Sequence, residues 1–331
     1  MIPLTLPRLI LKRLLANRTL LASIFVSIAL AITLLAASPT YLKALDRLAL
    51  NLEIGELTRP FSNVHVYGAN ILLTSEKLED TERAINKSIR QHLLPIYDRH
   101  ERYLIVDEYL AGIPNNPLPL PGSQNRLASR AYFRHLSNLE HHVHFVNGHM
   151  AGTTTTSNRT GPTIEAIVGM KTASSFDLNV GDKVTVTTHL TADKKIHVRI
   201  VGIVTPIDPN EDYWMPHASV FLNPPPITEG PVNEEIEYNS DEPPIPLFVS
   251  QEAMVNAIGE AYPGSLITSI WYVLIETEPL KAWSIKEIRR RLDDFETDIL
   301  RTMPGSQTFT GIRTMLSSFE KRQFFVRLPL L

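Results

Sequence analysis

The sequence contains no cysteine, which excludes disulfide bonds, thiolate metal sites and cysteine nucleophiles. It also has little excess charge of either sign: its formal net charge is −3. A charge this small argues against a nucleic-acid partner. Three catalytic motifs are missing as well: the G-x-x-x-x-G-K-[S/T] phosphate loop, the G-x-S-x-G nucleophile elbow and the H-E-x-x-H zinc motif. We therefore expect that the chain is not an enzyme and binds no cofactor.

Charged residues are absent altogether from Thr19 to Leu42. Because a helix needs about 20 apolar residues to cross a hydrocarbon core of ~30 Å, this stretch predicts a transmembrane helix over residues 19–42, buried in a lipid bilayer. Leucines recur at helical spacing after it, so we expect the helix to extend to residue 55. A cleaved signal peptide is the alternative, but its apolar region is typically about 7–15 residues long, shorter than this run.

Basic residues dominate only one flank of this run. Four of them precede it with no acidic residue among them: Arg8, Lys12, Arg13 and Arg18. After the run, lysines and arginines are mixed with acidic residues. The positive-inside rule therefore places residues 1–18, a basic amphipathic segment, in the cytoplasm, and the main domain outside the cell (inner) membrane.

A second apolar run begins at Phe324 and continues to Leu331. It fits either a tail that packs on the domain or the start of a second transmembrane helix. We favour the second interpretation for residues 323–331.

The residues between the two apolar runs predict an α+β fold, with a mixed α/β extracytoplasmic domain. Strands are expected over 63–74, 103–110 and 163–169, and helices over 75–94, 171–178, 284–303 and from 311 onward. Two β-rich runs near residues 179–203 predict a small, partly barrel-like sheet. We expect the domain to occupy 56–150 and 247–322, with a β-rich subdomain inserted at 151–222 and a proline-rich acidic loop at 223–246.

A local signature lies in the β-rich part, at SSFDLNVGDKVTVTT followed by IHVRIVGIVTPID. Gly181 and Asp182 are expected to form a tight turn, and Gly202 to let the strand bend or another backbone approach. With the preceding FVNGHM, this pattern resembles the extracytoplasmic core domain of FtsX-like and MacB-like permease subunits of ABC transporters. The recognisable pattern covers residues 143–206, and the layout of segments covers nearly the whole chain.

The resemblance implies a porter-like domain with a small inserted subdomain, a permease homo- or heterodimer, and a separate cytoplasmic ABC ATPase subunit. ATP-driven motion would reach the outer domain through the membrane helices. Complete permeases of this kind have four transmembrane helices, so the chain would be a fragment that lacks the last three. A reading frame that continues beyond Leu331 would favour this interpretation. A stop codon there would favour a membrane-anchored sensor or ligand-binding module; a membrane-tethered hydrolase is the weakest alternative.

Three further groups of residues are candidate binding sites. LEHHVHFVNGH contains several histidines, of which His142 and His144 would share one face of a strand and could bind a metal, although an exposed polar strand edge is the simpler interpretation. The acidic loop over 234–242 lacks the spacing of a calcium loop. An aromatic patch, Tyr213, Trp214 and Met215, is expected to pack on the subdomain rather than to contact a lipid or partner. We assign no metal site.

Overall fold

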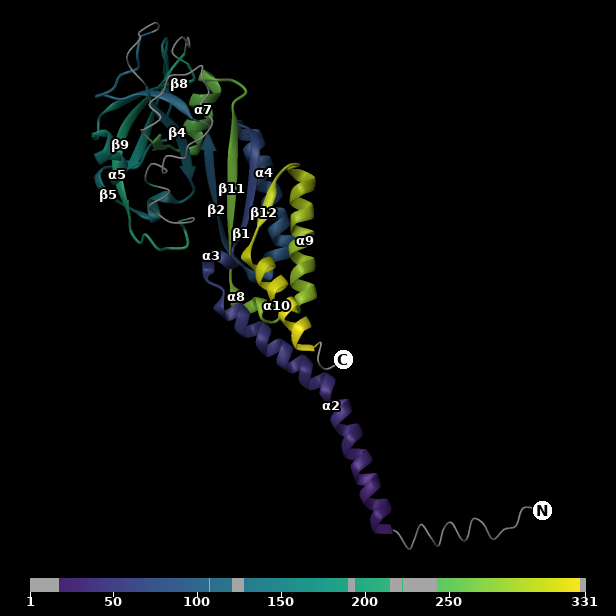
Figure 1. Ribbon diagram of the computed structural model, residues 1–331. Coiled ribbons are helices and arrows are strands. Elements are labelled where there is room, and N and C mark those ends of the chain that lie inside the picture. The colour runs from purple at the N-terminus through teal and green to yellow at the C-terminus, as the bar shows by residue number, and fades with distance from the viewer. Residues whose placement is uncertain are drawn as a thin grey trace, which may run out of the picture. The chain divides into compact units, whose positions relative to one another are not determined.

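The computed structural model describes residues 18–106, 108–120, 128–189, 194–214, 222 and 243–327. The chain divides into two units, residues 1–56 and 57–331 (Figure 1). Arg8, Lys12 and Arg13 lie outside the described residues, as do 328–331.

The first unit contains the helix α2, Arg18–Glu56. The prediction of one continuous helix reaching residue 55 is confirmed. Arg18 begins it. None of the helices, taken over their described residues, is both long and apolar enough to span a bilayer.

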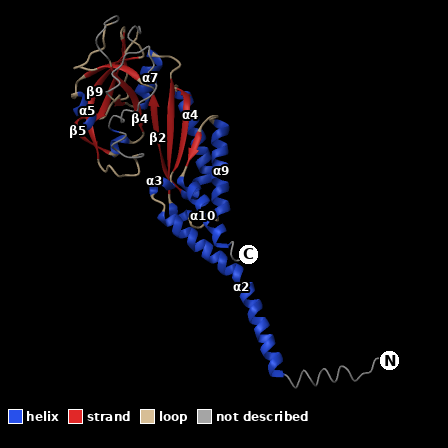
Figure 2. Cartoon of the chain, in the orientation of Figure 1, coloured by secondary structure: helices blue, strands red, loops and turns tan. Residues whose placement is uncertain are grey.

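Strands and helices both build the second unit, so the mixed α/β class is confirmed (Figure 2). The strands are β1 Val64–Leu72, β2 Tyr97–Val106, β3 Tyr109–Gly112, β4 Ser129–Leu136, β5 Val143–Gly148, β6 Thr156–Asn158, β7 Gly161–Gly169, β8 Lys183–Thr187, β9 Ile196–Pro206, β10 Ile245–Phe248, β11 Leu266–Ile275 and β12 Gln307–Phe309. The helices are α3 Arg59–Ser62, α4 Ser75–Ser88, α5 Met170–Phe176, α7 Gln251–Ala261, α8 Thr277–Leu280, α9 Ile285–Thr302 and α10 Gly311–Arg327, with short π and 3₁₀ turns at Ile89–Leu93, Leu94–Ile96 and Leu139–His141.

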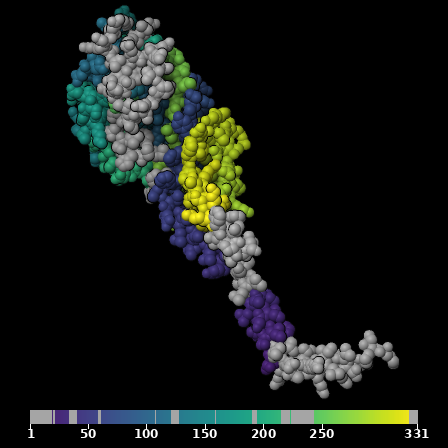
Figure 3. Space-filling view, in the orientation of Figure 1, coloured from purple at the N-terminus to yellow at the C-terminus, as the bar shows by residue number. Residues whose placement is uncertain are grey.

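An open antiparallel sheet forms one part of the unit, in the order β2-β11-β1-β12. The helices α4 and α9 lie together on one of its faces (Figure 2). In the space-filling view α9 and α10, yellow-green to yellow, lie at the surface of this unit (Figure 3). The helix α4 begins at the predicted residue, Ser75, and α9 begins one residue after the predicted Ser284. Thr74 and Ser284 cap these helices by accepting hydrogen bonds from the backbone N–H groups of Lys77 and Glu287. The buried stripe of α9 consists of Ile288, Leu292, Phe295 and Ile299.

A closed barrel forms the other part. Its strands follow one another as β4, β10, β7, β9, β8 and β3, and β3 pairs with β4 again. The short strand β10 closes the ring, lying parallel to β4 and meeting β7 at Phe248. β4 also pairs with β2, so this strand joins the barrel to the open sheet. The predicted limits of an inserted subdomain at 151–222 stay a prediction.

The single strand predicted over 103–110 is wrong. The structure has two strands, β2 starting at Tyr97 and β3 at Tyr109. The first half of β2, YDRHER, is polar and lacks the apolar alternation that marks a strand in sequence. Its pairing with β11, which extends as far as Tyr97 and Ile275, holds it extended instead.

Candidate functional site

The base of the open sheet is where the chain enters the second unit. Asn63, just after α3, is buried and bridges two points of β11: its side-chain amide donates to the Tyr272 hydroxyl (2.7 Å) and its carbonyl oxygen accepts from the Ile275 N–H (3.0 Å). The start of α10 packs against the same segment, because a Cβ on Gly311 would lie 2.6 Å from the Phe61 carbonyl oxygen. The entering segment and α10 therefore meet at one end of the sheet.

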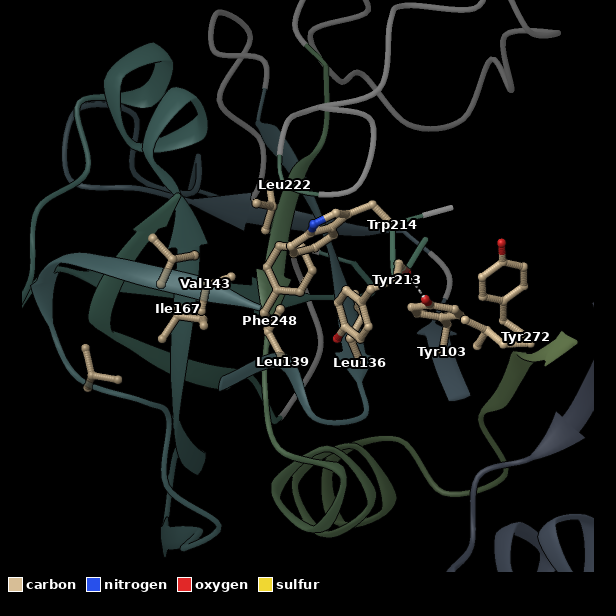
Figure 4. Packing of buried hydrophobic residues seen from close by; sticks show 13 residues of the cluster. Tyr103, Leu136, Leu139, Val143, Ile167, Tyr213, Trp214, Leu222, Phe248 and Tyr272 are labelled. Atoms are coloured by element: carbon tan, nitrogen blue, oxygen red, sulfur yellow. Dashed lines mark hydrogen bonds between the residues drawn. The ribbon is translucent and has the colours of Figure 1, made fainter. Parts of the chain in front are cut away.

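The junction between open sheet and barrel is built from aromatic side chains (Figure 4). Tyr213 and Trp214 are buried, which confirms that this patch packs inside the domain, and Met215 lies outside the described residues. The Tyr103 hydroxyl on β2 donates to the Tyr213 carbonyl oxygen, and the Tyr213 hydroxyl donates to the Ser137 carbonyl oxygen (2.8 Å). Burial raises the pKa of both tyrosines, so both phenols stay protonated and act as donors.

His142 belongs to this junction. Its ring stacks on Tyr213 with centroids 3.6 Å apart and an angle of 8° between the planes, and its Nδ1 lies 2.9 Å from Glu211 Oε2. His149 contacts the Met150 carbonyl oxygen instead (2.8 Å). Among the described residues no three His, Asp or Glu side chains come close enough together to hold a metal ion, and the acidic loop over 234–242 lies outside them.

The glycine motif lies on the barrel, where it fastens neighbouring segments to β9. Gly181 has φ +102° and donates its N–H to the Ile200 carbonyl oxygen (2.8 Å), while the Asp182 carboxylate accepts from the Asn179 N–H (2.7 Å). Gly202 lies where the chain around His149 crosses β9: a Cβ there would be 2.5 Å from the His149 carbonyl oxygen. Gly148 makes an even closer approach, with φ +81° and only 2.0 Å from its would-be Cβ to the Val201 carbonyl oxygen.

A charged network under α4 ties the helix layer to the sheet. Glu82 accepts hydrogen bonds from His100 Nε2 (2.7 Å) and Trp271 Nε1 (2.8 Å), and it pairs with Arg102 (3.2 Å). Arg102 in turn donates to Gln251 of α7. Burial alone would raise the pKa of Glu82, but the hydrogen bonds from His100 and Trp271 and the charge of Arg102 outweigh it and lower the pKa to about 2.

The sequence does not identify Asn63 or Glu82 as site residues. Asn63 and its partner Tyr272 are 209 residues apart in the chain, and Glu82 and its partner Trp271 are 189 residues apart. A polar residue that interrupts an apolar strand or helix pattern is the signal that could have marked them.

No protein-family model and no curated protein sequence matches this chain. Among solved structures, it is similar to the extracellular domain of the noncanonic ABC-type transporter YknZ from Gram-positive bacteria, with 11% sequence identity and a TM-score of 0.33. The similarity covers 75% of this chain and 100% of that one. A TM-score this low does not establish a shared fold.

Proposed function

We propose that the chain is part of an FtsX-like or MacB-like permease subunit of an ABC-type transporter in the cell (inner) membrane. In this proposal residues 19–42 cross the bilayer, the second unit lies outside the cell, and a separate cytoplasmic ATPase supplies the energy. The chain is not an enzyme; its outer domain passes ATP-driven motion to a substrate or partner.

The observation that carries this proposal is the apolar surface of α2. Six large apolar side chains within nine consecutive positions are 46–70% exposed: Ile24, Phe25, Val26, Ile28, Leu30 and Ile32. Positions this dense point in all directions around a helix, so no single protein face could cover them. Burying such a side chain is worth about 1.5–3 kcal/mol, and lipid can cover all sides at once.

The base of the domain supports a mechanical role. Because Asn63 is bonded to β11 at two points, a displacement of the entering segment would act directly on the open sheet. Tyr272 and Tyr103 belong to one buried cluster with Tyr213, which reaches the barrel. We propose that this cluster carries motion from the base to the barrel.

The part of α2 beyond residue 40 supports a permease dimer. Four exposed apolar side chains follow one another at intervals of four, three and four residues: Tyr41, Leu45, Leu48 and Leu52. This is the spacing of a coiled-coil seam, in which each side chain packs between those of a second helix. We propose that the same helix of a second permease chain covers this stripe.

We expect Leu48→Cys to form a disulfide-linked dimer in membranes on mild oxidation. Side chains at seam positions of paired helices approach closely, and a disulfide needs Cβ atoms about 3.5–4.5 Å apart. The chain has no native cysteine, so every cross-link on a non-reducing gel reports this position. Lys43→Cys, exposed on the opposite side of the helix, is the matched control. Equal cross-linking of both variants would contradict a specific seam.

The transporter proposal is tested by expressing the reading frame with its natural continuation. We expect the protein to stay in the membrane pellet after an alkaline carbonate wash, with residues beyond 60 open to protease added to spheroplasts. We also expect an ATPase carrying the phosphate-loop motif to copurify in mild detergent. Membrane retention without an ATPase would favour the anchored sensor, and recovery in the soluble fraction would refute both.

A further inference from the structure

The outer face of the barrel carries a groove of about 730 Å³ that has no part in the proposed relay. Alternate residues of three adjacent strands form its floor in two rows. Thr163, His197 and Thr185 face one another in the first row, and Glu165, Arg199 and Lys183 in the second. Residues directly opposite in neighbouring strands share one face of a sheet, so all six side chains point into the groove.

The rim of the groove is formed by the threonine-rich segment GTTTTSNRTG, which starts at Gly152. Thr154, Thr156 and Thr160 contribute to the lining. We call this site, floor and rim together, the threonine groove. A threonine hydroxyl both donates and accepts hydrogen bonds, so the threonines of the floor and rim give the groove both kinds of group.

Among the described residues that line the groove, Lys183 is the one cation without an ion pair. Glu165 accepts a hydrogen bond from the Gly152 N–H (3.0 Å) and pairs with Arg199, so these two charges satisfy each other. Lys183 makes no ion pair with any carboxylate among the described residues. His197 lies beside it in the next row, with its Nε2 3.1 Å from the Thr160 hydroxyl. Burial and the charges of Lys195 and Lys183 lower the pKa of His197, which keeps its ring neutral.

Two features define the ligand that fits. The backbone groups beneath the groove are already paired in the ladders of β7, β9 and β8, so a ligand must be held by side chains rather than added as a strand. Five of the twelve described residues that line the groove are threonines, and Lys183, at one end of the second row, is the cation among them without an ion pair.

We propose that the threonine groove binds an anionic oligosaccharide. The sugar hydroxyls exchange hydrogen bonds with the threonines, and a carboxylate or phosphate on the sugar binds at Lys183 beside His197. The residues that line the site belong neither to α2 nor to the junction, so this proposal holds or fails independently of the transporter role.

Isothermal titration of the full chain, held in a detergent without a sugar headgroup, tests the proposal. The probes are trigalacturonate, the neutral trisaccharide maltotriose, and inorganic phosphate. We expect trigalacturonate to bind about tenfold more tightly than maltotriose or phosphate, since a charge-assisted hydrogen bond adds to those of the hydroxyls.

Two variants separate the parts of the site. Lys183→Ala should weaken trigalacturonate binding about tenfold, because it removes the charged contact. Thr185→Val should weaken binding about threefold, because valine keeps nearly the shape of threonine and removes only a neutral hydrogen bond. Lys171→Ala removes an exposed lysine of α5 outside the groove and should change nothing. A thermal unfolding midpoint equal to that of the parent chain shows that a variant is folded. If the midpoint of Lys183→Ala is lower than that of the parent chain, Lys183→Gln is tested in its place.

Several results would overturn the proposal. If trigalacturonate does not bind, or binds no more tightly than maltotriose, the groove is not a site for an anionic oligosaccharide. Phosphate that binds as tightly as trigalacturonate reduces the site to a simple anion site. Equal losses in Lys183→Ala and Lys171→Ala would mean that only the overall charge of the protein matters.

Discussion

Gly148→Ala should lower the free energy of unfolding by about 3–5 kcal/mol, a large part of the total stability of a typical domain. The new Cβ would lie 2.0 Å from the Val201 carbonyl oxygen, far inside contact distance. The backbone would also have to keep φ +81°, which costs a residue with a Cβ about 1–2 kcal/mol. Thermal unfolding followed by circular dichroism measures the loss.

Three other glycines separate the two causes of this effect. Gly202→Ala introduces a clash at ordinary φ, with its Cβ 2.5 Å from the His149 carbonyl oxygen. Gly181→Ala keeps φ +102° but meets nothing within 4 Å, so only the conformational cost of about 1 kcal/mol remains. Gly259→Ala, in α7 with open space around it, should be neutral or stabilise the protein by up to about 1 kcal/mol. A loss at Gly259 as large as that at Gly148 would contradict this explanation.

Glu82→Ala should be the second most damaging change, costing about 3 kcal/mol. It removes the acceptor for His100 and Trp271 and leaves the largely buried Arg102 without its carboxylate. Glu79→Ala, exposed on the same helix, is the matched control and should change stability by less than about 0.5 kcal/mol. Equal midpoints of urea unfolding for the two variants would contradict the structural role of the network.

The same carboxylate predicts a pH dependence. The folded-state pKa of Glu82 is about 2, below its ordinary value of 4.5, so the folded protein binds fewer protons than the unfolded chain between these values. Its contribution to stability is therefore complete above pH 4.5 and is lost as the pH falls toward 2. Because the side chain is 28% exposed, we expect this contribution to be on the order of 2 kcal/mol. The Glu82→Ala variant should lack this part of the acid transition, and an unchanged acid midpoint would refute it.

The Glu82 network also bears on the proposed relay. A domain passes motion from its base to its far end only if its layers move together. Glu82 holds α4 to β2 and β11, and Arg102 extends the connection to α7 beside the barrel. Weakening the network should therefore weaken the proposed relay as well as lower the stability of the domain.

The sequence alone determined the elements whose signals are local. The uninterrupted helix α2, the capped start of α9 at Ser284 and the turn at Gly181 each depend on residues within a few positions of one another. Helical spacing, a capping side chain and the conformational freedom of glycine act over one or two turns of chain. They can therefore be recognised in the sequence without knowledge of the fold.

Only the tertiary structure decided how these elements meet. The closure of the barrel by β10, the bridge from Asn63 to Tyr272 and the burial of Glu82 against Trp271 join segments that are far apart in the chain. The rows of the threonine groove likewise exist only because the pairing of β7, β8 and β9 sets which residues lie opposite one another. Strand register is fixed by the packing of the whole core, since a shift of one residue would turn every side chain to the other face, and no short stretch of sequence contains that information.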